Sequence, residues 1–160
     1  MEGISEKVNT IIAKIGLEKL PVPLEEVAAL FNIQVVPYPD FPDNVSGMIM
    51  HKEGMTFIGV NQNHPKVRQR FTLAHELGHF LMGHDDHTIV DDRFDKPINK
   101  EKEANKFASE LLMPKQFIEK EIKEHSGKIG INQLAKKFEV SEQAMSIRLL
   151  DTGLIHKLHT

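Results

Sequence analysis

The motif His75-Glu76-Leu77-Gly78-His79 is the part of the sequence best suited to metal chemistry. Residues four apart on an α-helix lie on one face, so the imidazoles of His75 and His79 can bind one metal ion while Glu76 projects beside it. This spacing suits zinc, with Glu76 as the general base. The chain holds nine histidines, and a chance match to the pattern has a probability of roughly a few per cent, so the surrounding sequence must decide.

The residues around the motif favour a buried metal site. A helix is predicted from 66 to 82, and apolar side chains cover nearly all of its surface: Phe71, Leu73, Ala74, Leu77, Phe80 and Leu81. A buried helix rarely carries two histidines and a glutamate without partners for them. Because the chain has no cysteine, a bound metal must be held by His, Asp and Glu side chains. Gly78 disfavours the helix by about 1 kcal/mol relative to alanine, which is easier to accept if another backbone or a substrate approaches it closely.

A catalytic zinc ion needs a third protein ligand and one open position. The metzincin pattern would place a glycine at position 82 and a third histidine at position 85, whereas this chain has Met82 and Asp85. His84 is one residue out of register and is therefore not a metzincin ligand.

The segment from 99 to 114 offers two glutamates as the third ligand, and helical geometry separates them. At about 100° per residue, Glu101 shares a face with the small residues Ala104 and Ala108, whereas Glu103 points about 200° away among charged residues. Glu101 is thus predicted to face inward as the ligand and Glu103 to face water. Asn105, one turn after Glu101, is expected to orient a metal-bound histidine through a hydrogen bond.

Hydrophobic periodicity predicts an α+β fold, mostly helical, with a small antiparallel sheet. The predicted helices cover residues 5–15, 24–31, 66–82, 99–113, 115–124, 130–138 and 141–150, and the strands cover 33–36, 45–51 and 55–60. The acidic stretch 85–95 lacks periodicity and is predicted to be a loop. The strand at 55–60 is either an edge strand that pairs with an extended substrate or an ordinary core strand.

Two stretches taken together, RFTLAHELGHFLMGH (70–84) and EKEANKFASELLMP (101–114), resemble the ImmA/IrrE family of bacterial metallopeptidases. The similarity extends to PVPLEEVAALFNI, to GVNQN and to LAKKFEVSEQAMSIRL, and so covers most of the chain. In that family a glutamate three residues before the Ala-Asn pair is the third ligand, which corresponds to Glu101. The resemblance implies a gluzincin-like peptidase core with a zincin fold, expected at residues 1–128. This core is expected to bind one zinc ion per chain, and manganese is the other metal considered.

The resemblance also implies a substrate class, because such enzymes typically cut a helix-turn-helix repressor and so relieve repression. The expected function is therefore a zinc-dependent endopeptidase acting on a bacterial transcriptional repressor. The alternatives are a zinc-dependent regulator that binds DNA or a repressor without cutting it, and a structural zinc protein. Zinc would activate a water molecule whose proton passes to Glu76. The donor that stabilises the oxyanion is left open among Tyr38, His51, Arg70 and His84.

Residues 129–155 resemble a helix-turn-helix packed on the same domain. The match is partial, because Glu139 stands where a glycine is usual and only Lys136, Lys137 and Arg148 supply a basic surface. DNA binding is therefore the less favoured reading, behind packing on the core or recognition of a protein substrate. The formal charge of -3 gives no overall attraction to nucleic acid. The sequence shows no secretory signal and no membrane-length apolar run, so a cytoplasmic protein without membrane contact is expected.

Overall fold

The computed structural model describes residues 3–84, 88–90 and 98–159. In chain order, its elements are α1 (Ile4–Ile15), α2 (Leu24–Leu30), β1 (Ile33–Tyr38), β2 (Val45–Lys52), β3 (Met55–Asn61), α3 (Lys66–Leu81), β4 (Thr88–Val90), α4 (Ile98–Leu112), α5 (Lys115–Glu124), α6 (Ile131–Phe138), α7 (Glu142–Thr152) and the 3-10 helix η1 (Leu154–Lys157). This confirms the predicted α+β class, with helices predominating. Helix α4 begins at Ile98, one residue before the predicted start.

The sheet has the strand order β1-β3-β2-β4 and is mixed. β2 and β3 form the predicted antiparallel hairpin, with Ile49 opposite Ile58, whereas β1 pairs in parallel with β3. The prediction of a small antiparallel sheet is confirmed for β2 and β3 and misses the parallel neighbour β1, because periodicity identifies a strand but not its neighbour. β3 is hydrogen-bonded on both sides, so it is a core strand and is not an edge that could pair with a substrate.

The predicted loop at 85–95 is also wrong in part, because Thr88–Val90 form the edge strand β4 beside β2. Residues 85–87 and 91–95 of that prediction lie outside the described residues.

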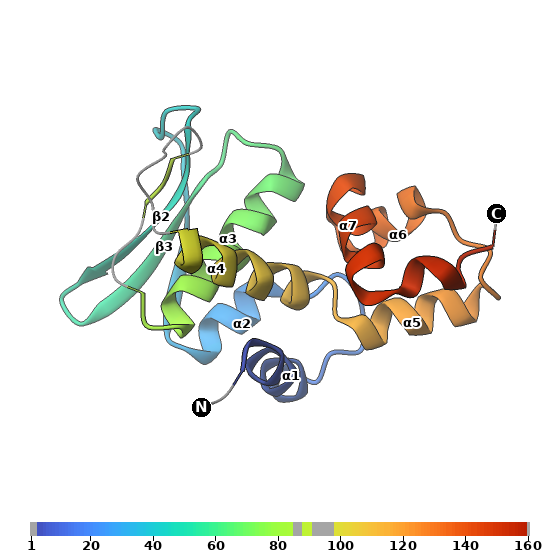
Figure 1. The fold of residues 1–160 in the computed structure, drawn as a ribbon. Coiled ribbons are helices and arrows are strands. Elements are labelled where there is room, and N and C mark those ends of the chain that lie inside the picture. The colour runs from blue at the N-terminus through green and yellow to red at the C-terminus, as the bar shows by residue number, and fades with distance from the viewer. Residues whose placement is uncertain (1–2, 85–87, 91–97, 160) are drawn as a thin grey trace.

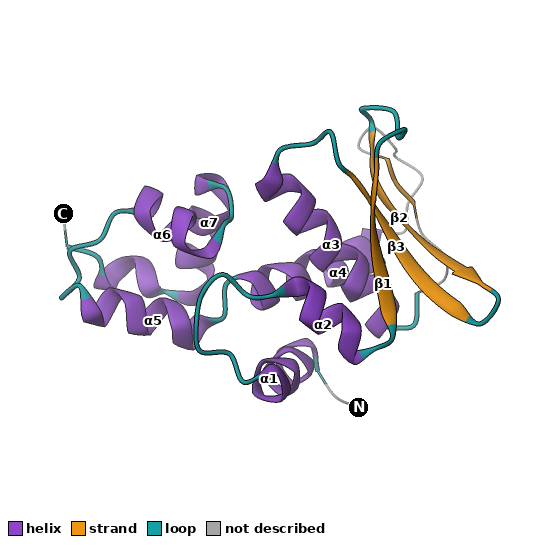
Figure 2. Cartoon of the chain, turned by 180° about the vertical axis from the view of Figure 1, so that it is seen from behind, coloured by secondary structure: helices purple, strands orange, loops and turns teal. Residues whose placement is uncertain are grey.

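Helices α3 and α4 pack against each other, and α3 also contacts β2 and β3 (Figure 1). Helix α1 packs on α4, and α2 packs on β1 and α3. Both views place α5, α6 and α7 together at the end of the molecule away from the sheet (Figures 1 and 2). In the ranges described, no helix combines the length and the apolar character that crossing a membrane requires.

One hydrophobic cluster runs from α1 to η1. Val8, Ile11 and Ile12 supply the buried stripe of α1, and burying each such side chain contributes about 1.5–3 kcal/mol. The same cluster includes Leu134 of α6 and Leu149 of α7. The C-terminal helices therefore share buried apolar contacts with the rest of the chain, and the proposed boundary at residue 129 stays a prediction.

The basic residues of the C-terminal helices are largely engaged with the protein itself. Arg148 Nε donates to the carbonyl oxygen of Met113 at 2.9 Å, which ties α7 to the end of α4. Lys137 Nζ pairs with Glu121 Oε2 at 3.1 Å. Two of the three cations that make up the thin basic surface thus have internal contacts, which weakens the case for a DNA-binding surface.

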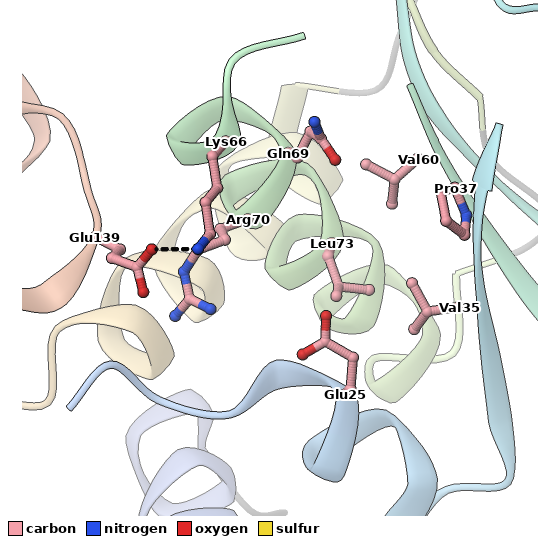
Figure 3. A pocket seen from close by; sticks show the side chains of 9 residues that line it. All are labelled: Glu25, Val35, Pro37, Val60, Lys66, Gln69, Arg70, Leu73 and Glu139. Carbon is pink, nitrogen blue, oxygen red and sulfur yellow. Dashed lines mark ion pairs between the residues drawn. The ribbon is translucent and has the colours of Figure 1, made fainter. Parts of the chain in front are cut away.

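Glu139 ends α6 in the left-handed conformation, with φ 53° and ψ 52°. Glu139→Gly is expected to stabilise the protein by roughly 0.5–1 kcal/mol, because a left-handed non-glycine residue costs about 1–2 kcal/mol and glycine avoids that cost. The ion pair that would be lost joins Glu139 Oε1 to Lys66 Nζ at 2.9 Å (Figure 3). It contributes little, since the Lys66 side chain is 76% exposed.

Urea unfolding measures the change in free energy, with Glu139→Ala as the matched control. Alanine loses the ion pair but keeps the left-handed strain, so Glu139→Ala should give no gain. Equal stabilities of the glycine and alanine variants would contradict the strain argument.

Candidate metal centre

Helices α3 and α4 meet closely at Gly78, the central glycine of the histidine motif. A Cβ built on Gly78 would lie 3.1 Å from Phe107 Cβ and 3.2 Å from Ala104 Cα, closer than side chains normally approach. Gly78 thus allows the backbone of α4 to come near α3, as its unfavourable helix propensity suggested. The small residues Ala104 and Ala108 are fully buried in the same interface. This approach brings Glu101, near the start of α4, to the two histidines.

His75, His79 and Glu101 form a tight group. The Nε2 atoms of the two imidazoles are 3.0 Å apart. Glu101 Oε2 lies 3.1 Å from His75 Nε2, and Glu101 Oε1 lies 3.1 Å from His79 Nε2. Both histidines are buried, whereas the Glu101 side chain is 23% exposed, so the group opens to solvent on the glutamate side.

The donor set fits a metal ion. Four ligands around zinc at about 2.1 Å lie roughly 3.4 Å apart, so the three groups need to separate by only a few tenths of an ångström. Two neutral imidazole nitrogens and one carboxylate are the ligands of many catalytic zinc sites. The group could therefore hold a metal ion, and its chemistry matches a divalent one.

Glu76 lies next to His75 on α3 and is fully buried, with 0% exposure. A carboxylate is rarely placed in a protein interior unless a cation or a proton compensates its charge. Glu76 follows His75 directly in the sequence, so the two residues share helix α3.

Asn105 lies on α4, as predicted, and its side chain is exposed. It lines a groove of about 770 Å³ together with Phe71, which lies one turn before His75. Among residues 3–84, 88–90 and 98–159, the Asn105 amide makes no hydrogen bond to either imidazole. Asn105 lies one helical turn after Glu101. At that position it is beside Phe71 and beyond the two histidines. Its role in orienting a ligand stays a prediction.

The four residues considered as oxyanion donors make different contacts. Tyr38 stacks on Phe41, with ring centroids 4.5 Å apart, and His51 Nδ1 lies 3.0 Å from Thr56 Oγ1 in the hairpin. His84 lies against His79 on the side of Nδ1, away from the Nε2 atom that faces Glu101. None of these contacts identifies an oxyanion donor.

Arg70 lies on the face of α3 opposite to the two histidines. It lines a separate pocket of about 300 Å³ between α2, β1 and the end of α6 (Figure 3). Its Nη2 donates to the carbonyl oxygen of Val22 at 2.8 Å. Burial lowers the pKa of the Arg70 guanidinium, while Glu139 and Glu25 favour its charged form. Arg70 therefore belongs to this pocket and is removed from the metal-binding group.

The contact between His84 and His79 is the feature that sequence reasoning missed. Nδ1 of His84 lies 2.6 Å from Nδ1 of His79. The glycine before His84 was the available signal, because a glycine just past a helix end turns the chain back toward the last turn.

Comparison with known proteins identifies a family and solved structures with a similar fold. The sequence profile of Peptidase_M78, the IrrE N-terminal-like domain, matches residues 28–150. No curated protein gives a significant match. A Mycobacterium tuberculosis transcriptional regulator superposes with a TM-score of 0.67 and 18% identity, covering 91% of this chain and 46% of that protein. The chain thus spans less than half the length of that regulator, and the similarity shows a shared fold alone.

Proposed function

Because the chain belongs to the Peptidase_M78 family of IrrE N-terminal-like domains, we propose that it is a zinc-dependent endopeptidase. One observation carries the proposal: the ligand atoms of His75, His79 and Glu101 lie within 4.8 Å of one another, and the buried Glu76 follows His75 directly on α3. In this proposal the first three residues hold the metal and Glu76 is the catalytic residue.

Zinc held by this group would lower the pKa of a bound water to about 7 and polarise the scissile carbonyl. Glu76 accepts the proton of the attacking water and returns it to the leaving amine nitrogen, so one carboxylate serves first as base and then as acid. Glu101, on the solvent side of the group, leaves access for a peptide from that direction. His75 and His79 are fixed by the rigid helix α3, which holds the ligands in place without rearrangement.

The proposed substrate is a protein, and within that class a helix-turn-helix repressor. Support comes from the family and from the structural neighbour, whose name is that of a transcriptional regulator. A bacterial transcriptional repressor acts in the cytoplasm, and the cytoplasm is therefore the compartment proposed for this protein. The thin basic surface of α6 and α7 makes protein recognition a better use of these helices than DNA binding.

The second candidate is a zinc-dependent regulator that binds a repressor or DNA without cutting, and the name of the structural neighbour favours it. A purely structural zinc site is less consistent with the geometry. Structural sites use four protein ligands, and the group found in the described part of the chain has three, one of them partly exposed.

Metal content and cleavage test the proposal together. The wild-type protein is expected to bind about one zinc ion per chain and to cut a helix-turn-helix repressor. The double variant His75→Ala/His79→Ala should lose both properties, because two of three ligands are gone; manganese is a further metal to assay. Unchanged metal content in the double variant would place the metal elsewhere, and zinc binding without cleavage in the wild type would favour the second candidate.

A further inference from the structure

The chain turns back on itself where α3 ends. Met82 follows the last helical residue, and Gly83 adopts a left-handed conformation with φ 72°. The amide of Gly83 donates to the carbonyl of Phe80 at 3.2 Å, and the amide of His84 donates to the carbonyl of His79 at 2.9 Å. These two bonds are the paired closure of a Schellman motif, which brings the residue after the glycine against the last turn of the helix.

In a Schellman motif, the side chains at these two positions frequently make an apolar contact. Here the two side chains are the imidazoles of His79 and His84. Nδ1 of His84 lies 2.6 Å from Nδ1 of His79, with ring centroids 4.8 Å apart. The His84 side chain is only 9% exposed, so the contact is shielded from water. On the other side of its ring, Nε2 of His84 lies 3.7 Å from Glu103 Oε1 on α4.

His79, His84 and Glu103 form a row that leads away from the metal site. The metal site decides which nitrogen atoms of this row donate and which accept a hydrogen bond. A neutral imidazole that binds a metal through Nε2 carries its proton on Nδ1. The facing Nδ1 of His84 must then be an acceptor, because two N–H groups cannot share a distance of 2.6 Å. His84 consequently carries its own proton on Nε2, which faces the carboxylate of Glu103.

We propose that His84 is a positioning residue of the metal centre: it accepts a hydrogen bond from His79 Nδ1–H, and so holds the Nε2 lone pair of His79 toward the metal. This inference rests on the proposed metal site and adds a residue that no spacing rule assigns. Glu103, on the same helix as Glu101, lies 3.7 Å from His84 Nε2 and makes no hydrogen bond with it at that distance. Such outer partners typically raise metal affinity by about 10–100-fold.

The test compares His84→Ala with His84→Asn. In the asparagine variant, the side-chain carbonyl oxygen would lie near the place of Nδ1 and can accept the same bond, whereas alanine removes the acceptor. We expect His84→Ala to weaken Zn²⁺ binding, measured by competition with a chelator, by about 10–100-fold, and His84→Asn to recover most of the loss. His156→Ala, an exposed histidine on η1, is the matched control and should bind zinc like wild type.

A spectroscopic readout separates positioning from packing. In the Co²⁺-loaded protein, the Nδ1 protons of ligating histidines give shifted, exchangeable NMR signals. The His79 signal should exchange slowly in wild type and His84→Asn, and much faster in His84→Ala. Equal zinc affinity and equal exchange in wild type and His84→Ala would overturn the inference, as would an asparagine variant no better than alanine. If the wild type binds neither Zn²⁺ nor Co²⁺, the proposed function itself fails.

Discussion

Glu76→Gln is expected to lower the rate of repressor cleavage by about 10²–10⁴-fold while the protein still binds about one metal ion per chain. Glutamine has the shape of glutamate but cannot accept the proton of the attacking water. The metal ligands His75, His79 and Glu101 are untouched by the change. Cleavage rate and metal content measured on the same preparation therefore separate loss of the base from loss of the site.

Thermal unfolding provides the control for folding. Glu76 is fully buried, and an ionised carboxylate is costly to bury, so a neutral amide of equal size should not lower the melting temperature of the metal-free protein. Glu124→Gln, an exposed glutamate on α5, is the matched substitution and should change neither cleavage nor stability. Cleavage by Glu76→Gln at the wild-type rate would show that another group is the base.

The directions of Glu101 and Glu103 could be predicted because a helix converts sequence spacing into direction. Glu101 and Glu103 are two residues apart, so they point to nearly opposite sides of α4. The structure brings the Glu101 carboxylate to 3.1 Å from both imidazoles and leaves the Glu103 side chain 50% exposed. The helix boundaries were equally accessible, since proline, glycine and apolar periodicity fix them locally.

Contacts between elements were harder to predict, because they depend on the whole chain. The parallel pairing of β1 with β3 could not be read from the apolar run at 33–36, which is compatible with either edge of the hairpin. Strand β4 was missed for a related reason. Three residues are too few to show alternation, and the strand exists because β2 offers an unpaired edge to them.

The contacts around the candidate site depend on more than the spacing of its residues. Asn105 was expected to contact a histidine, but one helical turn carries it to the groove beside Phe71. His84 was considered as a metzincin ligand, which spacing excluded, and as an oxyanion donor, but not as a partner of His79. Its contact with His79 follows from the left-handed Gly83, a local signal that concerns backbone geometry and not ligand spacing.

Glu101→Ala and Glu103→Ala form the sharpest test of the site, because the two residues share a helix and a charge. Glu101 contacts both imidazoles, so its removal leaves two histidines to hold the metal. We expect Glu101→Ala to weaken zinc binding by more than the roughly 100-fold typical of losing an outer partner, and to abolish cleavage. Glu101→Gln keeps the volume and should also bind poorly, which excludes loss of packing as the cause.

Glu103→Ala should be far milder. Its carboxylate is half exposed and 3.7 Å from His84 Nε2, beyond hydrogen-bond distance, so water and salt screen the interaction. We expect a change in unfolding free energy within about 0.5 kcal/mol and a loss of zinc affinity below about 10-fold. Chelator competition and repressor cleavage, measured side by side on the three variants and wild type, decide the ranking. If Glu103→Ala were the more damaging change, Glu101 would not be the ligand. The third ligand would then have to be sought among His84, Asp85 and Asp86. Of these three, Asp85 and Asp86 lie outside the described residues.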